Sequence, residues 1–240
     1  RTDTTGIYFE QAFDALGISA DQWWLRDAQQ IPSDYDLYLR VDHGDHYLSV
    51  LPPRLRPSVF YAIDTHLPHS WKKIRRIAPQ FDLVFCCHRD AATRLQGAEW
   101  LPLAGNPSQP GQTNGPRGYD VAFVGTDGGI PRKFYLQALR ERYPNSFIGK
   151  ADHRELMAVY RRAKVGFNYS IANDVNMRLF EILAAQTLLV TNALVSDDLS
   201  RLGLEDRRHL VLYHRPHEVF ELIDYYLAAS EERKRIAAAG

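Results

Sequence analysis

Short apolar runs of strand length alternate with amphipathic helical patterns along the whole chain. Strands that alternate with helices in this way are typical of βα units on a parallel sheet, so the sequence predicts an α/β fold. The predicted strands cover 36–41, 58–63, 82–87, 99–103, 120–124, 146–148, 164–169, 188–191 and 210–213. The predicted helices cover 7–16, 70–78, 90–96, 132–142, 153–163, 176–185 and 216–229.

One segment without periodicity interrupts this alternation. Residues 104–118 are rich in Pro, Gly, Asn and Gln, which is typical of a linker. We therefore expect an N-terminal βα domain over 1–105, a linker over 106–118 and a C-terminal βα domain over 119–240. The chain opens on a Thr/Gly turn and stops inside a helical pattern, which indicates a piece clipped at both ends.

The charge balance argues against general nucleic-acid binding. The chain has 29 basic and 29 acidic residues, whereas a nucleic-acid binder needs a basic excess to neutralise phosphates. No apolar run is long enough to span a membrane. The only cysteines, Cys86 and Cys87, are adjacent and cannot cross-link distant segments, so a reducing cytoplasm is expected.

The most informative segment for function is 164–192, which combines a strand, a polar loop, a helix and a second strand. Ligands of open α/β sheets bind at the carboxyl ends of strands and the amino ends of the following helices. There, Arg178 and the helix N-terminus could bind a phosphate, and Glu181 could accept hydrogen bonds from sugar hydroxyls. This arrangement predicts a nucleotide-sugar site. The alternative is that both residues are solvated charges.

A glycine-rich turn follows the predicted strand 120–124 and precedes two cations. Glycines let backbone amides approach an oxyanion, and cations can neutralise a diphosphate leaving group. The alternative is a simple turn with surface charges. Together, the turn and the segment 164–192 predict the donor-binding residues Gly125, Thr126, Arg132, Lys133, Asn168, Ser170, Asn176, Arg178 and Glu181.

Four segments resemble a known family. The segment NDVNMRLFEILAAQTLLVTN (173–192) resembles the donor site of GT-B-fold glycosyltransferases, in particular the spore-protein (CgeB-type) glycosyltransferase-like group. Segments 97–107, 119–139 and 156–170 agree with it, and the resemblance covers about 82–228. It implies two Rossmann-like domains that face a cleft. The wider fold often carries a first glutamate eight positions before Glu181, where this chain has Asn173.

The resemblance also implies an activity and its partners. A bacterial enzyme of this kind moves a sugar from a nucleoside diphosphate sugar to an acceptor hydroxyl, with no bound metal and no cofactor. The acceptor, a glycan, a protein or a small molecule, is not identified. Two alternatives remain open, a non-catalytic nucleotide- or sugar-binding module of the same fold and a nucleotide-sugar epimerase.

The N-terminal half offers candidates for the catalytic base. Asp64, His66 and His69 follow the predicted strand 58–63, and a carboxylate or imidazole there could take the proton of an acceptor hydroxyl. Asp64 resembles the aspartate found after this strand in the family, so it is the first choice and His66 the second. His88, after the next strand, is a lesser candidate. The alternative is that Asp64 caps the following helix or a turn.

Two further patterns have competing interpretations. The cluster of Asp42, His43, Asp45 and His46 invites a metal site, with His66 and His69 as further ligands. A glycine inside a polar turn explains the cluster better as a loop, so no metal is expected. The segment 71–79 is an amphipathic basic helix that could contact an anionic membrane. Alternatively, its apolar stripe packs on the sheet and its cations, Lys72, Lys73, Arg75 and Arg76, are solvated.

Overall fold

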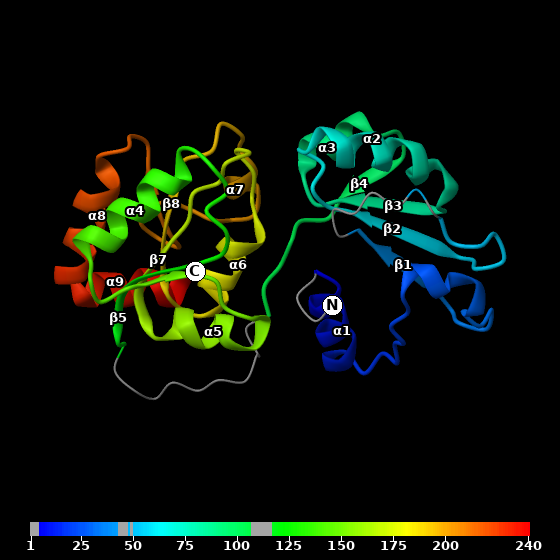
Figure 1. Ribbon diagram of the computed structural model, residues 1–240, viewed down its shortest axis with the longest axis horizontal. Coiled ribbons are helices and arrows are strands. Elements are labelled where there is room, and N and C mark those ends of the chain that lie inside the picture. The colour runs from blue at the N-terminus through cyan, green and yellow to red at the C-terminus, as the bar shows by residue number, and fades with distance from the viewer. Residues whose placement is uncertain (1–4, 43–47, 49, 107–116) are drawn as a thin grey trace. The chain divides into compact units, whose positions relative to one another are not determined.

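The computed structural model describes residues 5–42, 48, 50–106 and 117–240. By its internal contacts the chain divides into an N-terminal unit, Arg1–Leu103, and a C-terminal unit, Ala104–Gly240. Most of the predicted linker (107–116) lies outside the described residues, as do His43, Asp45 and His46 of the candidate metal cluster. Figure 1 shows that helices and strands form layers within each unit.

The N-terminal unit contains a parallel four-stranded sheet in the order β1-β2-β3-β4. Helices cover both of its faces: α2 and α3 pack on one side around Phe60, and α1 brings Phe9 against Tyr61 on the other. Strand β2 is therefore buried along its whole length. The strands are β1 (Tyr38–Val41), β2 (Ser58–Ala62), β3 (Leu83–Cys86) and β4 (Ala98–Trp100). The helices are α1 (Gly6–Ala15), α2 (Pro68–Ile77) and α3 (Arg89–Arg94), with short 3-10 turns at Leu25–Gln30 and Ala78–Gln80.

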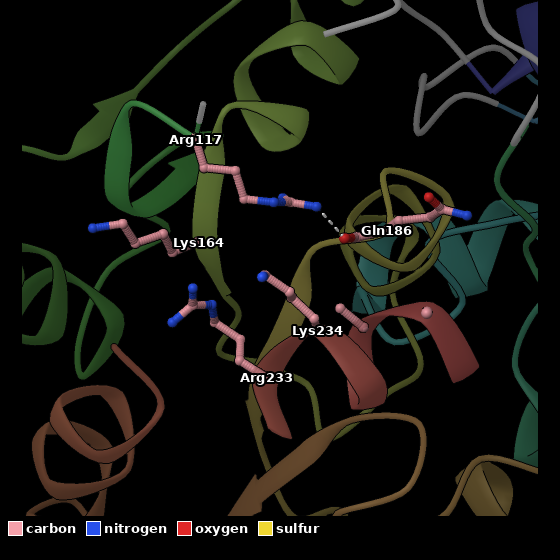
Figure 2. Close-up of a pocket in the computed structure, with 7 residues that line it drawn as sticks. Arg117, Lys164, Gln186, Arg233 and Lys234 are labelled. Carbon is pink, nitrogen blue, oxygen red and sulfur yellow. Dashed lines mark hydrogen bonds between the residues drawn. The ribbon is translucent and has the colours of Figure 1, made fainter. Parts of the chain in front are cut away.

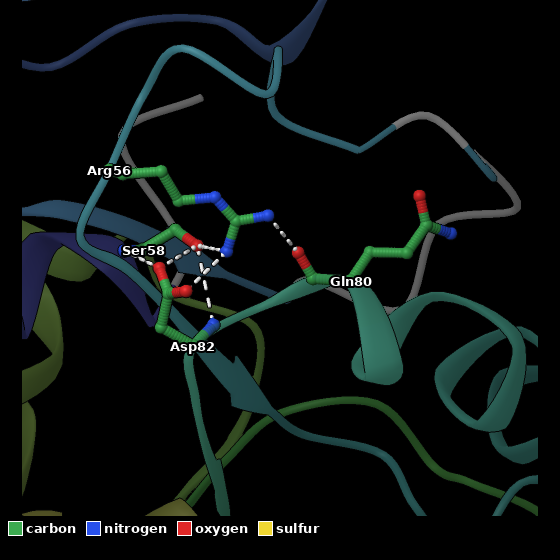
Figure 3. Close-up of polar contacts among 4 residues, drawn as sticks. All are labelled: Arg56, Ser58, Gln80 and Asp82. Atoms are coloured by element: carbon green, nitrogen blue, oxygen red, sulfur yellow. Dashed lines mark hydrogen bonds and ion pairs between the residues drawn. The ribbon is translucent and has the colours of Figure 1, made fainter.

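A polar network holds together the starts of β2 and β3 (Figure 3). The carboxylate of Asp82 accepts hydrogen bonds from the amide and hydroxyl of Ser58 at 2.7 and 2.9 Å. Arg56 lies 2.7 Å from the same carboxylate and donates to the carbonyl of Gln80. The pKa of Asp82 is lowered to about 2, mainly by the hydrogen bond from Arg56 and next by the one from the Ser58 amide. The network thus favours the ionised form of this carboxyl in the folded protein.

One expectation for the basic helix is wrong. Lys73 is buried on α2, and its ammonium lies 2.5 Å from Oδ1 of the fully buried Asp42. The other cations of this helix, Lys72, Arg75 and Arg76, are exposed, as expected for its polar face. The reason for the difference is helical periodicity, since Lys73 lies three residues after the buried Ser70 and four before the buried Ile77 and so shares their face.

The C-terminal unit contains a parallel five-stranded sheet in the order β6-β5-β7-β8-β9. Alternate residues of β5 face opposite layers: Phe123 packs under α4, α8 and α9, and Val124 packs under α5 and α6. The strands are β5 (Tyr119–Val124), β6 (Phe147–Gly149), β7 (Ala163–Phe167), β8 (Leu188–Asn192) and β9 (Val211–Tyr213). The helices are α4 (Arg132–Arg142), α5 (His153–Arg161), α6 (Met177–Ala184), α7 (Asp198–Arg201), α8 (Glu218–Ala228) and α9 (Ser230–Ala239).

The predicted α/β fold with parallel sheets is confirmed. The predicted helix 216–229 ends at Ala228, and a separate helix, α9, follows after Ala229, which has a non-helical backbone. None of the helices in the described part of the chain is long and apolar enough to cross a membrane.

Candidate donor site

The strand order of the C-terminal unit marks a place for a ligand. The chain passes from β5 to β6 on one side and returns to place β7 on the other side of β5. At such a reversal the two connections leave in opposite directions, and a crevice opens at the carboxyl ends of the two strands. Gly125 follows β5 and Asn168 follows β7, so two of the predicted donor-binding residues stand at this switch point.

Arg178 reaches this point from the first turn of α6. Its Nε donates to the carbonyl of Val124 at 2.9 Å, and its Nη1 donates to Oδ1 of Asn168 at 3.1 Å. Its guanidinium carbon lies 4.3 Å from the centre of the Phe123 ring, within the range of a cation–π contact. Arg178 is half-buried and joins three elements, so the alternative in which it is a solvated charge is wrong.

Asn168 is held in place by two residues that the sequence analysis did not single out. Its Nδ2 donates to the hydroxyl of Thr191 at 3.0 Å, which directs Oδ1 toward Arg178. The phenol of Tyr213 donates to the Asn168 carbonyl at 3.1 Å. Thr191 and Tyr213 lie near or at the carboxyl ends of β8 and β9. That position is the only sequence signal that could have identified them.

Gly125 leaves space for the Arg178 side chain and does not offer a free amide to an anion. Its amide donates to the carbonyl of Gly149 at 2.8 Å, so it is already used within the sheet. Its φ is +148°, and a Cβ at this position would overlap the guanidinium of Arg178. The expectation that the Gly125 amide approaches an oxyanion is therefore wrong. Glycine is needed at this position because it adopts this φ without strain and has no Cβ that would overlap the Arg178 guanidinium.

A second cation lies beside the same aromatic ring. Arg132, at the start of α4, donates from Nε to the carbonyl of Asp127 at 3.0 Å, and its guanidinium carbon lies 5.7 Å from the Phe123 ring centre. Burial and the nearby charge of Arg178 lower its pKa. In the described part of the chain, neither arginine forms an ion pair with a carboxylate. The carboxylates of Asp127 and Asp174 act on Arg132 without forming an ion pair and raise its pKa by a smaller amount. The two guanidinium groups therefore have no directly paired carboxylate among the described residues, and an anion could neutralise them.

The loop before α6 is held by its own side chains. The buried hydroxyl of Ser170 donates to the Asp174 carboxylate and accepts the Asp174 amide at 2.7 Å. Asn173 adopts a positive φ of 56° and accepts the amide of Val195. These contacts assign Ser170 a part in shaping the loop. Oδ1 of Asn176, at the start of α6, is buried and has no hydrogen-bond partner among the described residues.

The interior end of the site contains Glu181 and Tyr160. Glu181 is 8% exposed, which excludes its alternative role as a solvated charge. The fully buried Tyr160 phenol accepts the amide of Val124 at 3.1 Å. Burial raises the pKa of Tyr160, Arg178 lowers it and Glu181 raises it. The two charged groups therefore lie close to one phenol, which the sequence analysis missed.

The remaining predicted donor residues lie at the rim. Thr126 and Lys133 are exposed, in the glycine turn and on the first turn of α4 respectively. Gly128, with φ of +63°, lets this turn fold back over Arg132, because a Cβ there would overlap the guanidinium of that residue. The structure thus places Thr126 and Lys133 on the solvent side of Arg132.

The candidate base residues lie in the N-terminal unit, after β2. Asp64 is half-buried with a φ of 52°, and its carbonyl accepts the amide of Leu67. Leu67 is the N-cap of α2 and no side-chain cap is present there, so Asp64 does not cap the helix. Asp64 begins the turn before it, as the second half of that alternative expected. His66 is exposed and its ring centre lies 5.4 Å from that of His88. His88 is buried, with Nδ1 2.6 Å from the hydroxyl of Thr65.

Known proteins resemble this chain in family and fold. A family model described as "Glycosyl transferase-like" matches residues 113–240. Anabaena HepE in complex with UDP-glucose is similar over 78% of this chain and 66% of its own, with a TM-score of 0.56 and 10% identity. The apo structure of OtsA has a TM-score of 0.56 and 17% identity over 89% of this chain and 70% of that one.

A third solved structure has the same degree of similarity. It is an alpha-glucosyltransferase in complex with UDP-glucose and DNA containing an abasic site, with a TM-score of 0.56 and 12% identity over 90% of this chain and 78% of that one. At these identities the likeness shows the fold alone, which is that of GT-B glycosyltransferases. The chain spans 66% of the length of HepE. A search of curated proteins found no match.

Proposed function

The chain belongs to the glycosyl transferase-like family, and from this membership we propose that it moves a sugar from a nucleoside diphosphate sugar to an acceptor hydroxyl. One observation carries the proposal. Arg132 and Arg178 flank the Phe123 ring at the switch point of the sheet, and neither pairs with a carboxylate in the described part of the chain. The complexes of HepE and of the alpha-glucosyltransferase with UDP-glucose support a donor of this class.

The arrangement of these residues supports a separate role for each in donor binding. The donor diphosphate lies against Arg132 and Arg178, whose charges stabilise it as it departs. Oδ1 of Asn176 accepts a hydrogen bond from a donor hydroxyl or amide, and Glu181 faces the sugar or ribose hydroxyls. Because these groups are positioned by the protein before the donor arrives, little reorganisation opposes the reaction.

The transfer itself needs a proton acceptor. A bond forms between the acceptor oxygen and the anomeric carbon while the bond from that carbon to the diphosphate breaks. The acceptor proton passes to Asp64 or, as the second choice, to His66. We propose that no metal takes part, since the two guanidinium groups supply the positive charge. We further propose that the protein is a bacterial, cytoplasmic member of the CgeB-type group that transfers a hexose.

Binding measurements with nucleotides test this function. UDP, GDP, TDP and CDP, and their sugars, are titrated into the protein with and without EDTA while the unfolding temperature is recorded. One diphosphate should raise that temperature, and EDTA should not change the shift. Arg132→Gln should abolish the shift, whereas Arg154→Gln, on the exposed surface of α5, should retain it. A shift that EDTA removes contradicts metal independence, and no shift with any nucleotide contradicts the donor site.

One observation favours a second candidate, a non-catalytic nucleotide- or sugar-binding module. At the position where the wider fold often has its first glutamate, Asn173 accepts the amide of Val195 and so holds the loop. Donor binding without any transfer or hydrolysis of the sugar would select this candidate over the enzyme. An epimerase would consume the donor in the absence of any acceptor.

A further inference from the structure

A second cationic pocket lies at the opposite end of the same sheet. It is lined by Arg117, Lys164, Gln186, Arg233, Lys234, Ala237 and Ala238 and has a volume of about 200 Å³. Arg117 precedes β5, Lys164 is the second residue of β7 and Gln186 precedes β8, so the pocket opens at the amino ends of the strands. The six residues of β5 separate it from the donor site by about 20 Å.

The lining is strongly positive. Four of the seven lining side chains are cations, and none is a carboxylate. Figure 2 shows Arg117 reaching across from the start of β5 to the carbonyl of Gln186, while Lys234 projects from α9 below it. Two of the four charges have acidic partners, Lys164 with Asp120 at 2.7 Å and Lys234 with Glu231 at 2.8 Å.

The two arginines donate hydrogen bonds to neutral groups. Arg117 donates to the carbonyls of Ala163 and Gln186 and to the hydroxyl of Thr187. Arg233, which is 8% exposed, donates to two carbonyls at the end of α8. In the described part of the chain, neither forms an ion pair with a carboxylate. Burial lowers the pKa of both arginines, and the charge of Arg233 lowers that of Arg117 further. The carboxylates of Glu231 and Asp120, which pair with the two lysines, act on Arg233 in the opposite direction.

We propose that this pocket binds a small phosphoryl anion, either free phosphate or diphosphate or the terminal phosphate of a larger molecule. Buried charges are costly unless they are paired. The four cations have two carboxylate partners between them, so a dianion would neutralise the remaining positive charge at the two guanidinium groups, which form no ion pair in the described part of the chain. Guanidinium forks match the oxygens of a phosphoryl group better than ammonium groups do. The volume is below the 300–1,000 Å³ that is usual for drug-sized ligands, which favours one or two phosphoryl groups over a whole nucleotide.

Such a ligand would join parts of the unit that are distant in sequence. It would connect α9, which supplies Arg233 and Lys234, to the starts of β5 and β7. The binding energy would therefore stabilise the docking of the last helix on the sheet. This site does not depend on the donor site, because the two lie at opposite ends of the strands.

Calorimetric titrations at constant ionic strength test the proposal. The protein is titrated with inorganic phosphate, pyrophosphate, glycerol 3-phosphate and acetate. Phosphate or pyrophosphate should bind with one-to-one stoichiometry, and acetate should not. Lys234→Gln should weaken binding about tenfold. Arg235→Gln is the matched control, because it removes the same charge from the neighbouring exposed position of α9, outside the pocket lining, and should leave binding unchanged.

Hydrogen exchange locates the bound anion. Phosphate should protect amides in 117–119 and in α9. Protection of 125–133 and 168–178 instead would place the anion at the donor site and overturn the proposal. So would equal losses in the Lys234 and Arg235 variants, equal binding of acetate, or no saturable binding of any phosphoryl anion. If glycerol 3-phosphate binds as tightly as phosphate, the site accepts a terminal phosphate; if only the free anions bind, the ligand is phosphate or diphosphate.

Discussion

Arg178 donates a hydrogen bond from Nη1 to Oδ1 of Asn168 over 3.1 Å, and this contact joins α6 to the end of β7. Asn168 is itself held by Thr191 and Tyr213, from the two strands beyond β7. The arginine is therefore oriented by four elements of the C-terminal unit before any ligand binds. Such preorganisation is what makes a charged group effective at stabilising a departing anion.

The affinity of Arg178 for a diphosphate should depend on the residue that it contacts, Asn168. In Asn168→Asp, a carboxylate would replace the amide and pair with the guanidinium, which would oppose a diphosphate. We expect the affinity for the preferred nucleoside diphosphate to fall at least tenfold, roughly the effect of one charge-assisted hydrogen bond. Calorimetry measures the change. Gln96→Glu adds the same charge at an exposed position and should bind normally; equal affinity of both variants would contradict the assignment.

Gly125 should tolerate no side chain. Gly125→Ala combines an unfavourable φ with overlap between the new methyl group and the Arg178 guanidinium. We expect a loss of stability of about 1–2 kcal/mol or more from the backbone alone, together with weaker nucleotide binding. Urea denaturation and calorimetry measure the two effects. Gly149→Ala, at a position with open space and no positive φ, is the control. Unchanged nucleotide affinity in Gly125→Ala would show that the position of Arg178 does not matter for the donor.

The buried ion pair of the N-terminal unit should be important for folding. In Lys73→Met, the carboxylate of Asp42 would lose a partner 2.5 Å away while remaining buried. Breaking such a pair from one side typically costs about 3–5 kcal/mol. Lys72→Met, at the exposed neighbouring position on α2, should change the free energy of unfolding by less than about 0.5 kcal/mol. Similar stabilities of the two variants in urea denaturation would contradict a buried pair.

Asp82 should make the stability of the protein depend on acid pH. Hydrogen bonds from Arg56 and from the Ser58 amide lower its pKa from an ordinary value of 3.8 to about 2. A lowered pKa in the folded state means that the stabilisation is complete above about pH 4 and is lost as the pH falls toward about 2. Arg56→Gln should raise this pKa. The difference in unfolding free energy between wild type and Arg56→Gln should therefore shrink between pH 5 and pH 2; a constant difference would contradict the linkage.

Part of the candidate donor site could be predicted from the sequence because of where ligands bind in parallel α/β sheets. Once the strands were recognised, Gly125, Asn168 and Arg178 stood near strand or helix ends, and the structure brings these three together. Tyr160 and Tyr213 were missed because their contacts join residues 36 and 45 positions apart. The expectation that the Gly125 amide binds an anion was wrong because the amide donates to Gly149 in β6. That partner could not be identified without the strand order.

The sequence by itself determined the alternation of strands and helices, since the spacing of apolar residues selects each element locally. It also determined which residues stand at the ends of the strands. Only the tertiary structure decided the strand order that creates the switch point, the burial of Lys73 beside Asp42, and the grouping of Arg117 with Arg233. These features depend on contacts between segments far apart in the chain, whose energies arise only when the layers pack and water is excluded.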